Sequence, residues 1–179
     1  RIDLELRVAA FLVRDREGRL TGFRVTGTPA ANAPAGLLPR VTEFQIMRIA
    51  TGADGEAVMG VRPVTEITGD QRSVTTYGEN GHRTLVQLQS RRAGEWVTVR
   101  ESRPRMRDGI PLVDDDKNFL IDVRNLVTGQ NTVEHVTPLG QIARVDTGSL
   151  NRTVYSNFVL HPVTGAWVPG RTRVLYVSP

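Results

Sequence analysis

The chain has 179 residues, of which 39% are hydrophobic and 23% charged, and it contains no cysteine. This length suits one domain, or one domain with an arm, and the composition is that of a globular protein rather than a disordered or membrane-spanning one. The absence of cysteine excludes a disulfide scaffold, a thiol nucleophile and a thiolate metal site. The net charge is +4, but the basic excess gathers between Arg91 and Arg107, so the local cluster is the better indication of a partner.

The N-terminal part of the chain predicts a β-hairpin. Residues 8–14 and 19–25 are β-rich runs that flank the turn Asp15-Arg16-Glu17-Gly18. Residues 28–39 follow with three prolines and no charge, a composition typical of an extended loop or linker. We therefore divide the chain into a hairpin over 1–27 that can act as an arm, a linker over 28–39, and a main β domain over 40–179.

The main domain is predicted to consist largely of short strands. Residues 41–49 suit either a helix or a strand. The clearer strand runs are residues 58–64, 72–77, 83–90, 96–101, 132–137, 141–145, 152–160 and 171–177. Residues 117–127 differ, because their apolar side chains fall on one helical face between Asp116 and Gly129, which could cap its ends. The sequence thus predicts a mainly β fold, an antiparallel sandwich or barrel, with one short helix near 117–127.

Asp146 is the catalytic candidate. The motif Asp146-Thr147-Gly148-Ser149 matches the short signature of aspartic proteases, in which a pair of carboxylates activates water. One copy could serve only in a homodimer, and Arg144 stands where an apolar residue is expected. A polar turn is therefore the favoured interpretation. Phosphate loops, dinucleotide fingerprints and serine-nucleophile motifs are absent from the sequence, so the residues favour a non-enzymatic protein without a cofactor.

The acidic run Asp114, Asp115 and Asp116 is the metal candidate, because carboxylate oxygens bind calcium or magnesium. Capping of the predicted helix explains the same three acids without a ligand, since negative charge is favourable at a helix N-terminus. The three histidines, His82, His135 and His161, share no metal-binding spacing. We therefore predict no metal site.

Six arginines form the candidate partner-binding site: Arg91, Arg92, Arg100, Arg103, Arg105 and Arg107. On one continuous strand, the last three would project from the same face about 6.6 Å apart, close to the spacing of phosphates along a nucleic-acid strand. An edge strand or subunit contact is the favoured alternative. Pro104 removes a backbone donor, and charge on an edge discourages unwanted pairing.

Together these features favour a structural or assembly protein, a subunit of a larger assembly such as a phage or virion component or an extracellular filament. Its partners would be other protein subunits, most simply copies of the same chain. Two alternatives stay open. One is a small β-barrel that binds or transforms an apolar small molecule in its interior, and the other is a nucleic-acid-associated protein that uses an Arg-rich edge strand. No apolar run is long enough for a membrane span, and no segment assigns a compartment.

Overall fold

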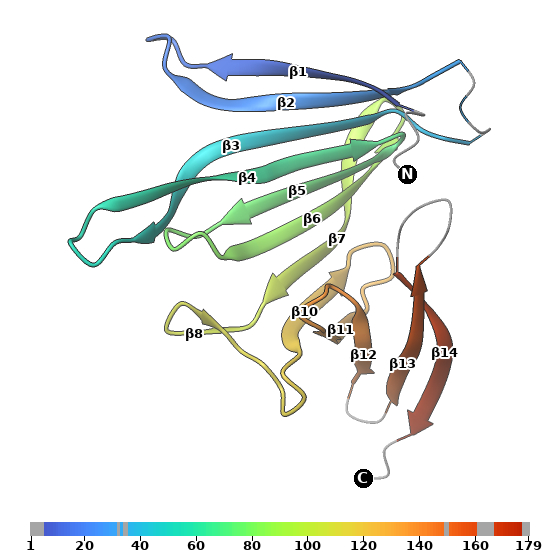
Figure 1. Ribbon diagram of the computed structural model, residues 1–179. Helices are drawn as coiled ribbons and strands as arrows, with labels where there is room; N and C mark the ends of the chain where they lie inside the picture. The colour runs from blue at the N-terminus through green and yellow to red at the C-terminus, as the bar shows by residue number, and fades with distance from the viewer. Residues whose placement is uncertain (1–5, 32, 34–35, 149–150, 161–166, 177–179) are drawn as a thin grey trace. The chain divides into compact units, whose positions relative to one another are not determined.

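The protein is mainly β, as the sequence predicts. The computed structural model describes residues 6–31, 33, 36–148, 151–160 and 167–176 (Figure 1). These residues form fourteen strands and no helix. A helix able to cross a membrane is accordingly not found in the described part of the chain.

The strands divide between two compact units, Arg1–Val99 and Arg100–Pro179. Unit 1 contains β1 (Leu6–Arg14), β2 (Leu20–Pro29), β3 (Arg40–Thr51), β4 (Ala57–Thr68), β5 (Gln71–Tyr77), β6 (Arg83–Arg92) and the start of β7 (Glu95–Pro104). Unit 2 contains the end of β7, then β8 (Met106–Arg107), β9 (Ile110–Pro111), β10 (Phe119–Asn125), β11 (Asn131–Val136), β12 (Ile142–Thr147), β13 (Asn151–Leu160) and β14 (Trp167–Tyr176).

Twelve of the described strands pair in one antiparallel order, β1 to β7 and then β10 to β14. The short strands β8 and β9 form a separate hairpin between β7 and β10. Every strand thus pairs with its neighbour in the chain, apart from this one interruption. Neither sheet closes on itself within the described residues, so the predicted sandwich or barrel is not confirmed.

Turn chemistry explains why the chain reverses where it does. Ala93 and Gly94 connect β6 to β7 with φ values of 48° and 87°, and Asp108 and Gly109 connect β8 to β9 with 52° and 77°. Two consecutive residues with positive φ are the mark of the type I′ turn, whose twist matches that of the flanking strands. The predicted turn at residues 15–18 is also present, with Gly18 at a φ of 81°.

The N-terminal hairpin belongs to the sheet of unit 1. Strand β2 pairs with β3 from Gly22, opposite Gln45, to Gly27, opposite Arg40. The rings of Phe23 and Phe44 stack across this pair with their centroids 4.6 Å apart. The ambiguous run 41–49 is therefore a strand, while a role for residues 1–27 as an exchanged arm remains a prediction.

The prediction of a helix over 117–127 is wrong. Lys117 has a φ of 64°, which a right-handed helix does not allow. The side chain of Asn125 accepts hydrogen bonds from the amides of Val127 and Thr128 at 2.9 and 3.0 Å. The residues at the predicted C-terminal end of the helix therefore form a turn. Between these points the chain forms β10, because cross-strand pairing with β7 and β11 outweighs the helical spacing of its apolar residues.

The register of unit 2 sorts its side chains onto two faces. Asp122 of β10, Val133 of β11 and Asp146 of β12 lie opposite one another in a row, because each strand pairs directly with the next. Alternation then places His135, opposite Arg144, on the same face. One face of this unit is therefore rich in charged groups.

Candidate functional site

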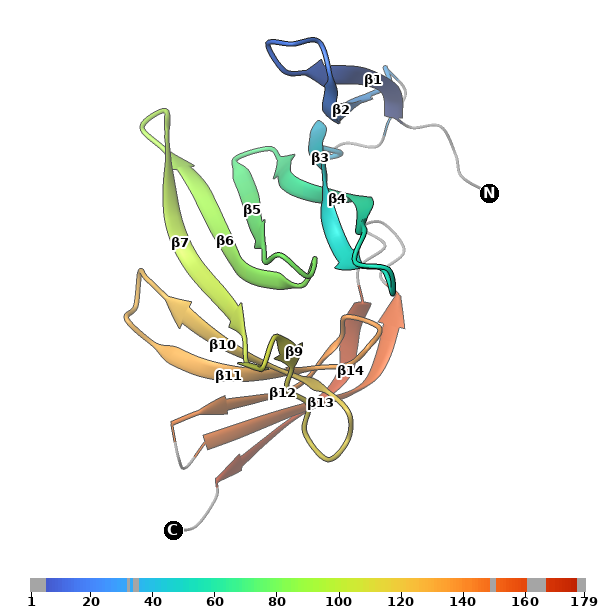
Figure 2. The same cartoon turned by 90° about the vertical axis from the view of Figure 1, so that its left-hand side faces the viewer.

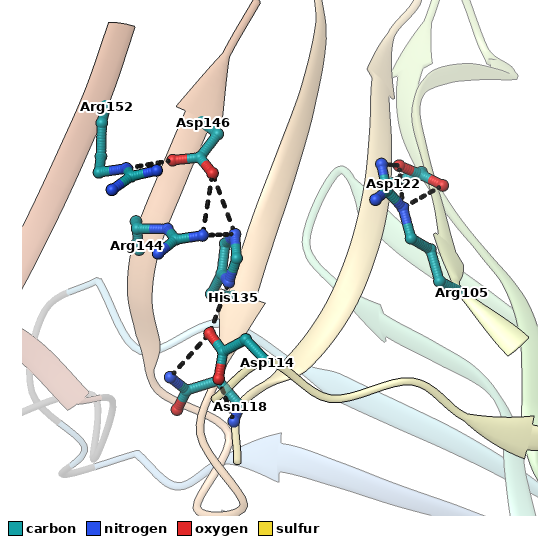
Figure 3. A network of polar contacts seen from close by, with 8 residues as sticks. All are labelled: Arg105, Asp114, Asn118, Asp122, His135, Arg144, Asp146 and Arg152. Carbon is teal, nitrogen blue, oxygen red and sulfur yellow. Dashed lines mark hydrogen bonds and ion pairs between the residues drawn. The ribbon is translucent and has the colours of Figure 1, made fainter. Parts of the chain in front are cut away.

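A polar network centred on His135 is the best-defined group of side chains in unit 2 (Figure 3). His135 lies on β11 and is only 3% exposed. Its Nδ1 atom is 2.7 Å from Oδ2 of Asp114, which belongs to the turn before β10. Its Nε2 atom is 2.7 Å from Nη2 of Arg144 and 3.2 Å from Oδ2 of Asp146, both on β12. A buried imidazole thus links two aspartates from separate parts of the chain.

The chemistry of the partners assigns the proton on the imidazole. A carboxylate only accepts hydrogen bonds and a guanidinium only donates them. Nδ1 of His135 therefore carries a hydrogen and donates to Asp114, while Nε2 accepts from Arg144. In this neutral form Asp146 still receives donors, because Nη2 of Arg144 and Nε of Arg152 each lie 3.1 Å from its carboxylate. In the Nδ1–H tautomer, both ring nitrogens of His135 and the carboxylate of Asp146 thus have hydrogen-bond partners.

Asp114 anchors the network to the turn that leads into β10. Its Oδ1 accepts a hydrogen bond from the backbone amide of Asn118 at 2.9 Å, and its Oδ2 accepts one from the Asn118 side chain at 3.3 Å. Desolvation by burial would raise the pKa of Asp114. The hydrogen bonds from Asn118 and His135 outweigh that effect and lower the pKa to about 2. The carboxylate is therefore held in its ionised form.

Asp114 is expected to make stability depend on pH at the acid end. Its pKa falls from 3.8 to about 2 on folding, so its contribution is present above pH 3.8 and is lost as the pH falls towards 2. The full shift corresponds to about 2 kcal/mol, and solvent near the turn reduces this to roughly 1–2 kcal/mol. Urea denaturation of the wild type and of Asp114→Asn between pH 2 and 6 measures it. The difference between the two proteins should shrink as the pH falls, and a constant difference would contradict the assignment.

Beside the network lies an open pocket of about 540 Å³. Asp146 belongs to its lining, together with a group of charged side chains from β7 and β10 that includes Arg103, Asp122 and Arg124. Arg105 donates to both oxygens of Asp122, with distances of 2.7 to 3.1 Å. The hydrogen bond to Asp122 raises the pKa of Arg105, against a smaller lowering by desolvation. Charged side chains thus share the lining of this pocket with Val123 and Val133.

The structure distributes the six predicted arginines over several elements. Arg91 and Arg92 end β6 in unit 1, while the other four lie in unit 2. An edge-strand position is wrong for Arg100 and Arg103, because β7 lies between β6 and β10 in the strand order. The continuous strand over 96–107 is also interrupted, since β7 ends at Pro104 and Arg107 belongs to β8.

Three of these arginines already have acidic partners within unit 2. Arg100 contacts Glu134 at 2.6 Å and Arg105 contacts Asp122 at 2.7 Å. Arg103 lies 3.6 Å from Glu101, a looser pair. Ion pairs within unit 2 therefore neutralise three of the six arginines that the sequence suggests as a binding site for a partner.

The two acidic candidates meet at the same histidine. Asp146 lies within β12, so the predicted polar turn is wrong at that residue, although Gly148 follows in a turn with a φ of 63°. Ser149 lies outside the described residues. Asp114 caps the amide of Asn118 in a turn and does not cap a helix. Among the described side chains no cluster suited to a metal ion is found, at Asp115 and Asp116 or elsewhere.

The sequence does not indicate the role of His135, because the three histidines share no metal-binding spacing. The signal that could have found its role is the turn at residues 137–140, between two β-rich runs. Folding that hairpin places His135 beside Arg144. The contact between Asp114 and His135 could not be predicted from this hairpin, because it depends on the conformation of the turn before β10.

Comparisons with known proteins add no assignment: no family model, curated protein or solved structure matches this chain.

Proposed function

We propose that the protein is a non-enzymatic subunit of a larger assembly, in which other copies of the chain cover its exposed apolar surface. The observation that carries the proposal is the small amount of buried apolar surface. Val123, 6% exposed, is the one large hydrophobic residue that is buried among those described. By contrast, Val8, Leu12 and Met59 are each more than half exposed. Uncovered apolar side chains in this number are typical of interaction surfaces.

The total surface area supports the same proposal. The chain exposes 12568 Å², whereas one compact domain of its mass would expose about 8,600 Å². Two independent domains of half that mass would together expose about 10,400 Å², so division into two units does not account for the difference. The remaining excess of about 2,000 Å² per chain is more than twice the ~800 Å² that one partner buries in an interface of standard size.

The alternatives have less support. A barrel interior needs a closed sheet, and the sheets of the described residues are open. The pocket of unit 2 is open, and its lining includes charged side chains such as Arg103 and Asp122, an arrangement that differs from an enclosed apolar interior. Binding of nucleic acid through the arginines would compete with the acidic partners of Arg100 and Arg105. Burial of apolar surface between subunits does not require these ion pairs to break.

The proposal predicts that the purified chain self-associates at micromolar concentration. Sedimentation equilibrium should give a mass that is a multiple of 19.8 kDa. Because apolar burial drives the association, it should persist or strengthen in 1 M salt, at which exposed ion pairs are screened. As a control, Gln130→Lys, at an exposed polar residue before β11, should leave the mass unchanged. A mass of 19.8 kDa at every concentration would overturn the proposal.

A further inference from the structure

Among the described strands, β1 has a partner on one of its long sides and none on the other. It is the first strand in the sheet order and pairs only with β2 in the described part of the chain; Figure 2 shows it joined to unit 1 through β2 alone. Its side chains are also uncovered, with Val8 67%, Phe11 55% and Leu12 66% exposed. A long apolar edge of this kind is a template for pairing with another strand.

Strand β14, the last strand in the sheet order, differs from β1 in the residues that discourage pairing with another chain. The last strand, β14, carries Pro169, which lacks a backbone donor, and two arginines at Arg171 and Arg173. Proline and charge are the features by which proteins protect an edge strand from pairing. Strand β1 has no proline, and its two arginines, Arg7 and Arg14, lie near its ends, so the six residues between them are uncharged. The chain thus protects one edge and leaves the other open to a partner.

We infer that β1 pairs with β1 of a second copy of this chain, antiparallel, across a two-fold axis at Ala10. The inference rests on the proposed function and names the contact through which assembly occurs. A two-fold contact buries the open edge of both subunits at once and leaves the protected β14 edges outside, so the assembly closes as a dimer. The backbone hydrogen bonds would supply affinity, and the side chains would supply register.

The geometry of antiparallel pairing selects the register. Residues directly opposite one another both point their backbone groups towards the partner strand, or both point them away. Two identical strands must therefore pair residues whose numbers are both even or both odd. Arg7 and Arg14 can then never lie opposite each other, which avoids repulsion between like charges. Among the registers that remain, the one centred on Ala10 overlaps all nine residues of β1.

This register also matches the side chains. Val8 lies opposite Leu12 of the second copy, on the face that β1 shares with Phe23 and Val25 of β2. On the other face Ala9 lies opposite Phe11, so that a small residue meets a large one. The pairs therefore extend an apolar surface that already crosses β1 and β2.

A cysteine at Ala10 tests the inference directly, because the natural chain has no cysteine. In the proposed pairing, residue 10 faces itself with a Cα separation of about 4.5–5.5 Å, within the range that a disulfide spans. Ala10→Cys should give a covalent dimer under mild oxidation. Val8→Cys alone should react more than tenfold more slowly, since residue 8 would lie about 13 Å from its own copy. An equal mixture of Val8→Cys and Leu12→Cys should cross-link.

Any other result of the cross-linking and sedimentation experiments contradicts either the β1 contact, its register or the proposed function. If the Ala10→Cys protein is oligomeric by sedimentation but does not cross-link, the β1 contact is wrong while the proposed function stands. If it is monomeric at every concentration, the proposed function fails as well. If Val8→Cys alone reacts as fast as Ala10→Cys, the strands pair in parallel and the two-fold register is wrong. Val174→Cys on β14, at a residue 57% exposed, should remain uncross-linked.

Discussion

Replacing His135 with alanine is expected to lower the free energy of unfolding of unit 2 by about 3–5 kcal/mol, the range for removing one partner from a buried charged network. The substitution removes the 2.7 Å donor of Asp114 and the 2.7 Å acceptor of Arg144, whose Nη2 atom then has only Asp146, at 3.1 Å. Nε of Arg144 is already buried without a hydrogen-bond partner, so this side chain has little to replace the lost contact. Urea denaturation followed by circular dichroism, with hydrogen exchange of the β11 amides, measures the effect.

Two further variants make this prediction specific. His135→Asn keeps a donor that can reach towards Asp114, but its shorter side chain places no acceptor where Nε2 of His135 accepts from Arg144, so about half of the stability should return. His82→Ala removes an exposed histidine and should change the free energy of unfolding by less than about 0.5 kcal/mol. If His135→Ala were as mild as His82→Ala, the network would not contribute to stability.

The second large effect is expected in unit 1, where Gly22→Ala should destabilise the protein by about 3 kcal/mol. The added methyl group would lie far inside the van der Waals radius of the backbone oxygen of Phe44 on the neighbouring strand. Backbone cannot move aside as a side chain can, so β2 and β3 must separate locally. Loss of hydrogen-exchange protection should be confined to the pairing of β1, β2 and β3, with the β10–β12 amides unchanged.

Gly78→Ala is the matched control for this steric effect. The nearest atom to its new methyl group is the Thr84 methyl, at 3.2 Å, which belongs to a side chain that can adjust. The change should cost less than about 1 kcal/mol, because the alanine also restricts the unfolded chain. Equal effects of the two substitutions would show that the Phe44 carbonyl is not the cause.

The strands and their turns could be predicted from the sequence because both are local. Alternation of side chains and turn sequences such as Asp15-Arg16-Glu17-Gly18 act over a few residues, and the structure confirms them. Residues 117–127 show the limit of this approach. Their apolar spacing fits a helix, but pairing of Val123 opposite Ser102 on β7 and Thr132 on β11 decides the structure. A single-sequence pattern does not contain those partners.

The candidate site was predictable only as separate pieces. The motif around Asp146 indicates a protease aspartate, and the acidic neighbours of Asp114 indicate a metal ligand. In the structure both carboxylates instead contact His135. Their convergence on His135 depends on the β11–β12 register and on the turn that carries Asp114. The hairpin register is local, but Asp114 lies 21 residues from His135 in the chain, so no inspection of either aspartate alone would reveal the network.

The pairing of each strand with its neighbour in the chain has a consequence for how the protein folds. Contacts between residues close in sequence close small loops, which cost little entropy, and proteins dominated by them fold fast for their size. Here hairpins such as β5–β6 can form before later strands exist, and each new strand adds to an edge already made. The protein is therefore expected to fold vectorially during synthesis, strand by strand, unlike β proteins whose sheets join distant segments.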